Sequence, residues 1–345
     1  MSRRELALFV VAMYAWFVVL IVAFDNFPSR ILRTGDNPSY RAESAALRGA
    51  APPDFTARHF FGYPLATAAI ATVTRTPDAT AMVMVSVIAS LIAVFVAGEL
   101  WGGVIAAWFA VANIDWVQRS LCGGAEPLFA ALIVLGIAAA RRERWTLAAA
   151  CGALATIVRP LGIWLLVAIG IELLRRRNGW RLASAVSIAI AIGGAYLALL
   201  RILFGDAFGS FRWYSAMGLG HDRTFIPFVT LFLSHGEHPL TKRNVVKALV
   251  WMLITLAGVV VAISRKLWRE QRVEWLFAAL YLASFFFFPA WWIEGEYSRY
   301  LTPVIPLLFV ALARWIPTNR AVMWIGGVAF VTLAAVKDMP QFKLF

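Results

Sequence analysis

The sequence predicts an all-α protein, a polytopic bundle of about eleven transmembrane helices. Of its 345 residues, 61% are hydrophobic and only 15% are charged, and the mean hydropathy is +0.74. Soluble domains are roughly half apolar and a quarter charged. Leu6 to Phe24 is a run of nineteen uncharged residues, close to the ~20 that cross ~30 Å of hydrocarbon. Similar runs recur along the chain, so we expect a single membrane domain over 1–345.

Clusters of basic residues orient these segments. After Arg3 and Arg4, Lys and Arg gather at 141–144, 175–181, 265–272 and 314–320. Such clusters mark cytoplasmic loops, so we place all of them on one side, and the net charge of +13 does not indicate a nucleic-acid partner. The expected spans are 5–24, 79–98, 103–118, 126–140, 146–158, 160–174, 182–200, 245–263, 273–289, 302–316 and 321–336, with the C-terminus outside.

Two apolar stretches do not read as simple crossings. Thr146–Leu174 has basic clusters at both ends, and Pro160 at its centre removes a backbone donor and favours a break. We therefore expect two short helices that meet at Arg159, near the outer face. Tyr63–Thr74 is short for a span, and a crossing there would move the 141–144 cluster outside. We expect it to be a re-entrant or surface-lying helix.

The outer loops hold the unusual chemistry. They cover 25–78, 201–243 and 290–300, and the first is longer than a passive connector needs to be. In it, Gly35 and Asn37-Pro38 make a turn, and a short surface helix is expected from Pro38 onward. Asp36 would stand at its N-terminal end, where the helix dipole stabilises a carboxylate. From the residues alone, Asp36 is either a helix cap or a functional group.

Three further charged residues stand out. Arg159 would be costly at membrane depth unless it is paired or faces an aqueous cavity, although snorkelling to the interface remains open. Arg299 lies beside Tyr300, where interfacial anchoring is the alternative to a functional role. Glu126 begins a helix before Pro127, a position that acidic residues favour for the dipole alone.

Five stretches occur in an order that resembles the GT-C superfamily of membrane glycosyltransferases, and together they touch most of the chain. They are GDNPSYRAESAALRG, HFFGYPLATA, RSLCGGAEPLFAALIVLGIAAARRERW, LAAACGALATIVRPLGIWLL and EYSRYLTPVIPLL. The resemblance implies a first helix followed by a long outer loop with a catalytic aspartate. It also implies transfer of a sugar, with inversion, from a polyprenyl phosphate to an acceptor hydroxyl on the outer side.

The resemblance also suggests roles for individual residues. Asp36 is the expected general base for the acceptor hydroxyl, with Asp25 as the alternative. Arginine suits the donor phosphate because its planar fork gives bidentate contact. The expected phosphate contacts are Arg159, Arg299, Arg58 and His59, and the expected cavity-lining residues are Tyr40, Arg41, Glu43, Glu126 and Tyr300. A divalent metal held by Asp36 and Glu126 stays open, and no other cofactor is assigned.

The expected partners are a polyprenyl-phosphate-linked sugar, an acceptor glycan, lipid or protein, and the bilayer itself. The Ala- and Arg-rich composition and the short loops favour a bacterial inner membrane, with the site facing outside. Two other classes stay open. A multi-helix transporter or flippase of a lipid-linked or anionic substrate would usually have paired repeats, and we find none. A non-catalytic subunit of an envelope assembly is the third possibility.

Overall fold

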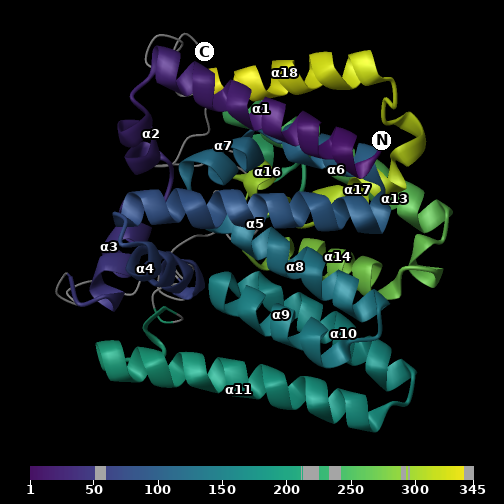
Figure 1. The fold of residues 1–345 in the computed structure, drawn as a ribbon. Helices are drawn as coiled ribbons and strands as arrows, with labels where there is room; N and C mark the ends of the chain where they lie inside the picture. Colours follow the sequence, from purple (N-terminus) through teal and green to yellow (C-terminus); the bar gives the residue numbers. More distant parts are fainter. Residues whose placement is uncertain are drawn as a thin grey trace.

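The computed structural model describes residues 1–50, 60–210, 212, 225–232, 242–288, 293 and 296–337. These residues form sixteen α-helices and short 3₁₀ turns, and the described part of the chain contains no strand. The helices pack side by side around a hydrophobic core to which the first and the last helix both contribute (Figure 1). The predicted all-α class is therefore confirmed.

The first helix and the fifth run antiparallel along the bundle (Figure 1). Ser2 and Glu5 form a capping box that begins α1 (Arg3–Phe24). α5 (Asp78–Trp101) returns to the same end, where Glu99 pairs with Arg3 at 3.1 Å. The helices between them are α2 (Phe27–Arg33), α3 (Asn37–Leu47) and α4 (Gly62–Thr74).

These three short helices gather at the other end of α1 and α5. The Arg48 side chain after α3 pairs with Asp78 at the start of α5, at 2.5 Å. α1 runs from one end of the bundle to the other, and α5 runs back. α4 lies between them in the chain and begins and ends near the far end, so it adds no passage from end to end (Figure 1). The re-entrant or surface-lying position expected for Tyr63–Thr74 in the membrane stays a prediction.

The middle of the chain contains paired helices with one unexpected break. The residues predicted as one span over 103–118 form α6 (Gly103–Val111) and the start of α7 (Ile114–Cys122). That prediction of a continuous helix is wrong because the Asn113 side chain accepts hydrogen bonds from the backbone N–H groups of Asp115 and Trp116 and begins a new helix. α7 then meets α8 (Ala125–Arg141) at an angle of 105°.

The break predicted at Arg159-Pro160 is present. α9 (Trp145–Val158) ends at Arg159, whose backbone is extended, and a 3₁₀ turn over Pro160–Gly162 leads into α10 (Ile163–Arg175). α11 (Gly179–Phe204) follows and lies along the edge of the bundle in Figure 1.

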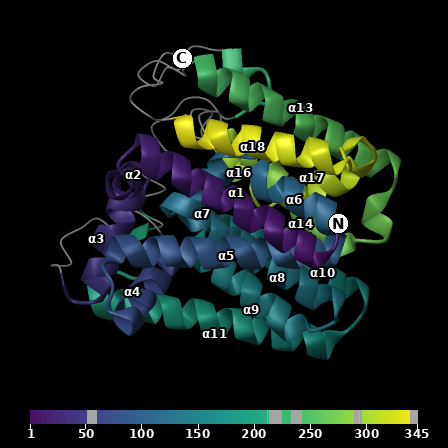
Figure 2. The ribbon, with the colours of Figure 1, turned by 45° about the horizontal axis from the view of Figure 1, so that its top comes forward.

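The last third of the chain is built from helices of unequal length. They are α13 (Lys242–Ser264), α14 (Arg272–Ser284), α16 (Tyr297–Tyr300), α17 (Ile305–Ala311) and α18 (Arg320–Val336). α18 packs along α1, where the Trp16 indole N–H donates to the Thr332 hydroxyl at 2.9 Å. Figure 2 shows α13 beside α18 at the top of the bundle. The predicted span 302–316 is not one continuous helix: it holds the seven-residue α17 and a 3₁₀ turn over Ala313–Trp315.

Among the described residues, four helices are long and apolar enough to cross a bilayer, and there are five if the bent α7–α8 pair is taken as one span. They are α1, α5, α11 and residues 244–264 of α13. Other expected spans correspond to shorter helices. The fourteen residues of α9, for example, rise about 21 Å at ~1.5 Å each, less than the ~30 Å hydrocarbon layer.

The basic clusters lie at one end of the bundle, as predicted. Ion pairs join them there: Arg142 contacts Glu99 at 3.2 Å, Arg141 contacts Glu274 at 2.5 Å, and Arg320 contacts Glu5 at 2.5 Å. The short helices α2, α3 and α4 occupy the opposite end (Figure 1).

Candidate active site

The centre of the site is the Glu126 carboxylate. Gly123, at φ +89°, and Gly124 form a tight turn between α7 and α8, a conformation that glycine adopts most readily. Glu126 therefore falls in the first turn of α8, where it is only 2% exposed. Its Oε1 accepts hydrogen bonds from Arg159 Nη2 and from Arg299 Nε. One buried carboxylate thus holds two guanidinium groups.

Arg299 extends this network to the first loop. It lies on α16 and is buried, and its Nη2 donates to Asp36 Oδ2 at 2.5 Å. Its Nη1 lies 3.6 Å from Glu296, which is half-exposed. Asp36 immediately precedes α3, and its side chain is 36% exposed. Four residues from distant parts of the sequence, Asp36, Glu126, Arg159 and Arg299, therefore form one cluster.

The break between α9 and α10 positions Arg159. The last turn of α9 ends just before it, and its guanidinium lies over the Tyr300 ring, 5.6 Å from the centroid. The Tyr281 hydroxyl donates to the Tyr300 carbonyl at 2.7 Å and fixes that segment. Arg159 therefore has both a carboxylate and an aromatic face as partners.

Tyr40 covers the cluster from the first turns of α3. It is buried and packs edge to face against Tyr63, with centroids 5.0 Å apart. Burial, with a smaller effect from the Asp36 carboxylate, raises the pKa of Tyr40 well above its usual value, so its hydroxyl stays protonated at neutral pH. The Tyr63 hydroxyl accepts from the Gly124 N–H at 3.0 Å and supports the glycine turn.

Other residues that the sequence suggested lie away from this cluster or outside the described residues. Asp25 is 6% exposed and is held by Arg33 at 2.8 Å and by Arg30 at 3.4 Å, at the end of α1. Of the remaining α3 residues, Glu43 is buried and Arg41 is exposed. Arg58 and His59 lie outside the described residues.

The structure adds a residue that the sequence analysis missed. Arg119, on α7, is 7% exposed, and its side chain packs against Gly124. A Cβ at Gly35 would overlap its guanidinium. The only sequence signal is an arginine seven positions before Glu126, in a polar stretch that also holds Asp115 and Gln118, and this spacing alone did not indicate burial.

The two carboxylates do not fit a metal site. Asp36 and Glu126 both bind the Arg299 guanidinium, so a cation already lies between them. Among the described residues there is no group of three or more His, Cys, Asp or Glu side chains that could hold an ion. The chemistry of the cluster is that of arginines and carboxylates.

A second polar cluster lies on the other side of α16. Asp115 accepts from Lys247 at 3.0 Å and from Lys337 at 2.6 Å, and also from the Ser298 hydroxyl. The Asn113 side-chain amide donates to the Ser298 carbonyl at 2.7 Å. Since Ser298 directly precedes Arg299, a single turn of chain separates the two clusters.

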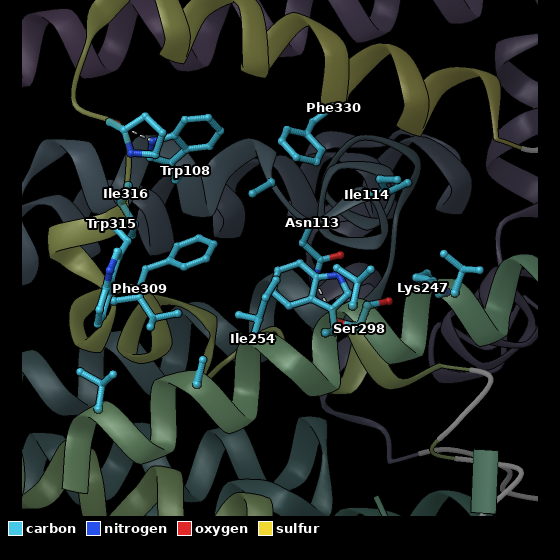
Figure 3. A pocket seen from close by; sticks show the side chains of 18 of the residues that line it. Trp108, Asn113, Ile114, Lys247, Ile254, Ser298, Phe309, Trp315, Ile316 and Phe330 are labelled. Carbon is cyan, nitrogen blue, oxygen red and sulfur yellow. Dashed lines mark hydrogen bonds between the residues drawn. The ribbon is translucent and has the colours of Figure 1, made fainter. Parts of the chain in front are cut away.

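This second cluster closes one end of a large apolar groove (Figure 3). The groove has a volume of about 1330 Å³ and lies between α6, α13, α17 and α18. Its walls include Trp108, Ile254, Phe309 and Phe330, and Lys247 and Ser298 stand at its polar end. Its volume exceeds the ~300–1,000 Å³ of most small-molecule pockets, so it can take a long apolar chain.

Comparison with known proteins gives one structural match. No protein-family model matches the sequence, and no curated protein matches it. The fold is similar to the crystal structure of ArnT from Cupriavidus metallidurans bound to undecaprenyl phosphate, with a TM-score of 0.58 and 16% identity. The similarity covers 95% of this chain and 62% of the ArnT chain, so this chain spans about three fifths of that protein. The chain therefore shares the fold of that ArnT structure.

Proposed function

We propose that this protein transfers a sugar from a polyprenyl-phosphate donor to an acceptor hydroxyl. The observation that carries the proposal is the Asp36–Arg299–Glu126–Arg159 cluster, in which the half-exposed Asp36 carboxylate contacts the buried Arg299 and Glu126 joins Arg299 to Arg159. Such a transfer needs a base for the acceptor and cations for a phosphate leaving group. The GT-C fold and the undecaprenyl phosphate named with ArnT support the donor class.

Asp36 is the general base in this proposal. It is the more exposed carboxylate of the cluster, 36% against 2% for Glu126, so an acceptor can approach it. The acceptor oxygen bonds to the anomeric carbon while its proton passes to Asp36. The bond from the anomeric carbon to the phosphate oxygen breaks, and polyprenyl phosphate leaves with the electron pair. A single displacement of this kind inverts the anomeric centre.

Asp25 is the alternative base, and its surroundings favour it less. Arg33 contacts both of its carboxylate oxygens, at 2.8 and 3.0 Å, and Arg30 adds a third contact. Its side chain is almost fully buried. A carboxylate held in this way has little access to an incoming hydroxyl.

Arg159 and Arg299 are the proposed phosphate contacts. Their carboxylate partners orient the planar guanidinium forks, which match phosphate geometry. The buried Nε of Arg159 has no hydrogen-bond partner in the structure. A phosphate beside it would satisfy this donor and gain charge as the glycosidic bond breaks, which is when cations stabilise it most.

The apolar groove is the proposed path of the isoprenoid chain. Its walls are almost entirely apolar, and its polar end lies at Ser298, the residue before Arg299. A chain in the groove would leave its phosphate near α16. We further propose that the basic end of the bundle is cytoplasmic, following the positive-inside rule, so that the cluster faces the periplasm of a bacterial inner membrane. The acceptor would be a glycan, a lipid or a protein.

The direct test is to incubate purified protein in detergent with a panel of radiolabelled polyprenyl-phosphate sugars and a membrane extract as the acceptor source. We expect label to move from at least one donor to a new product, with release of polyprenyl phosphate. The same protein in proteoliposomes tests the transporter alternative. Movement of a lipid-linked or anionic substrate across the bilayer without cleavage of any donor would overturn the proposal.

A further inference from the structure

Arg119 is a buried arginine on α7. It is 7% exposed, and its Nη1 is fully buried and has no hydrogen-bond partner within the part of the chain that the structure describes. Among the described residues, no carboxylate lies within ion-pair distance of it. A buried charge of this kind is costly, and proteins normally pair it.

The position of Arg119 ties it to the Glu126 cluster. Its Cδ would lie 2.8 Å from a Cβ at Gly124, and its guanidinium lies against Gly35, the residue before Asp36. Gly35 has φ +50°, so the turn before α3 is bent around the arginine. The guanidinium therefore lies between the loop that presents Asp36 and the turn that presents Glu126.

The three arginines of the site differ in the carboxylates that they contact. Arg159 contacts Glu126, and Arg299 contacts Glu126 and Asp36. Arg119 contacts neither. Glu296 adds a half-exposed carboxylate beside Arg299, but water screens it. Of the three arginines, only Arg119 has no carboxylate within ion-pair distance among the described residues.

We infer that Arg119 binds the phosphate of the lipid-linked donor. This inference rests on the proposed function and adds a residue to it. A sugar–phosphate–lipid diester carries one negative charge, which would give the Arg119 guanidinium an ion-pair partner. A sugar hydroxyl at the same place would occupy the Nη1 donor but leave the charge uncompensated. Arg119 is therefore the contact that separates a phosphorylated ligand from a neutral one.

The experiment compares undecaprenyl phosphate with the uncharged alcohol undecaprenol, each binding to the purified protein in nanodiscs. We expect the parent protein to prefer the phosphate. Arg119→Met keeps the length of the side chain and removes its charge. It should lower phosphate affinity by about 10- to 100-fold, the range of a lost charge-assisted hydrogen bond, and leave undecaprenol affinity unchanged. Arg119→Lys should recover part of the loss. Arg144→Met, at an exposed arginine just before α9, is the matched control and should bind as the parent does.

Thermal unfolding without ligand separates binding from a structural role. Removal of an unpaired buried charge should leave the Tm of Arg119→Met equal to or above that of the parent. If Arg119 instead had a structural role, the Arg119→Met substitution would lower the Tm. A parent that binds phosphate and alcohol equally would contradict the proposed donor class and this inference with it. A parent that prefers the phosphate, with Arg119→Met retaining that preference, would overturn the role of Arg119 alone.

Discussion

The Glu126→Gln substitution tests the organisation of the cluster most sharply. In the parent, one carboxylate oxygen accepts from both Arg159 and Arg299. The amide keeps the size of the side chain and removes its charge. Arg299 still has Asp36 and Glu296, whereas Arg159 loses the one carboxylate that contacts it in the described part of the chain.

The expected loss of stability follows from this difference between Arg159 and Arg299. Removing one partner of a buried ion pair costs about 3–5 kcal/mol, and only Arg159 loses its last partner, so one such loss applies rather than two. The Arg159 side chain is 14% exposed, which lets water offset part of the loss and places it near the lower bound. At ~2 °C per kcal/mol for a chain above 150 residues, 3 kcal/mol corresponds to a Tm decrease of roughly 6 °C.

The protein carries its own reporters for this measurement. Cys122 and Cys151 are free and buried, so a thiol-reactive dye reports unfolding as they become accessible. Glu143→Gln is the matched control because Glu143 pairs with Arg176 and Arg181 at the surface, where ion pairs contribute little. If Glu126→Gln melts at the same temperature as this control, Glu126 does not hold the arginines as described.

Three further predictions concern topology, the glycine turn and the phosphate contact. Arg142→Cys should be protected from a membrane-impermeant thiol reagent added outside, whereas Asp36→Cys should react; labelling at 142 would overturn the layout. Gly35→Ala should weaken undecaprenyl phosphate binding about tenfold, because the added Cβ overlaps the Arg119 guanidinium. Unchanged binding would mean that phosphate binding does not depend on where the Arg119 guanidinium lies. Arg159→Lys should recover only part of the donor affinity lost in Arg159→Gln, since the fork is lost. Parental affinity of the Gln variant would exclude a phosphate contact.

Local sequence signals predicted much of the fold. Pro160 predicted the break after α9 because proline acts on its own turn of helix. The basic clusters predicted which ends of the helices lie together, and the same constraint predicts that Tyr63–Thr74 does not cross the membrane. The break at Asn113 was missed because the apolar run hides it. A side chain that hydrogen-bonds to nearby backbone N–H groups can begin a new helix in place of continuing the old one. Hydropathy gives no sign of such hydrogen bonds.

The site was predicted only in part. The motifs identified Asp36, Glu126, Arg159 and Arg299 separately, but their contacts depend on how α3, α8 and α16 pack against one another. Arg119 was missed for the same reason. In the sequence it belongs to a short polar stretch of α7, and only the packing of that helix beside Gly35 and the glycine turn buries it.

The central claim is that the cluster around Asp36 carries out sugar transfer. Its most direct test is turnover of a radiolabelled polyprenyl-phosphate sugar by Asp36→Asn and Asp25→Asn, prepared in the same detergent and compared with the parent. Asparagine keeps the size and capping ability of aspartate and removes its basicity. We expect Asp36→Asn to fold, to bind donor and to lose about 10²–10⁴-fold in turnover, and Asp25→Asn to lose much less. Near-parental turnover by Asp36→Asn would contradict the assignment, and collapse of Asp25→Asn alone would move the base to the end of α1.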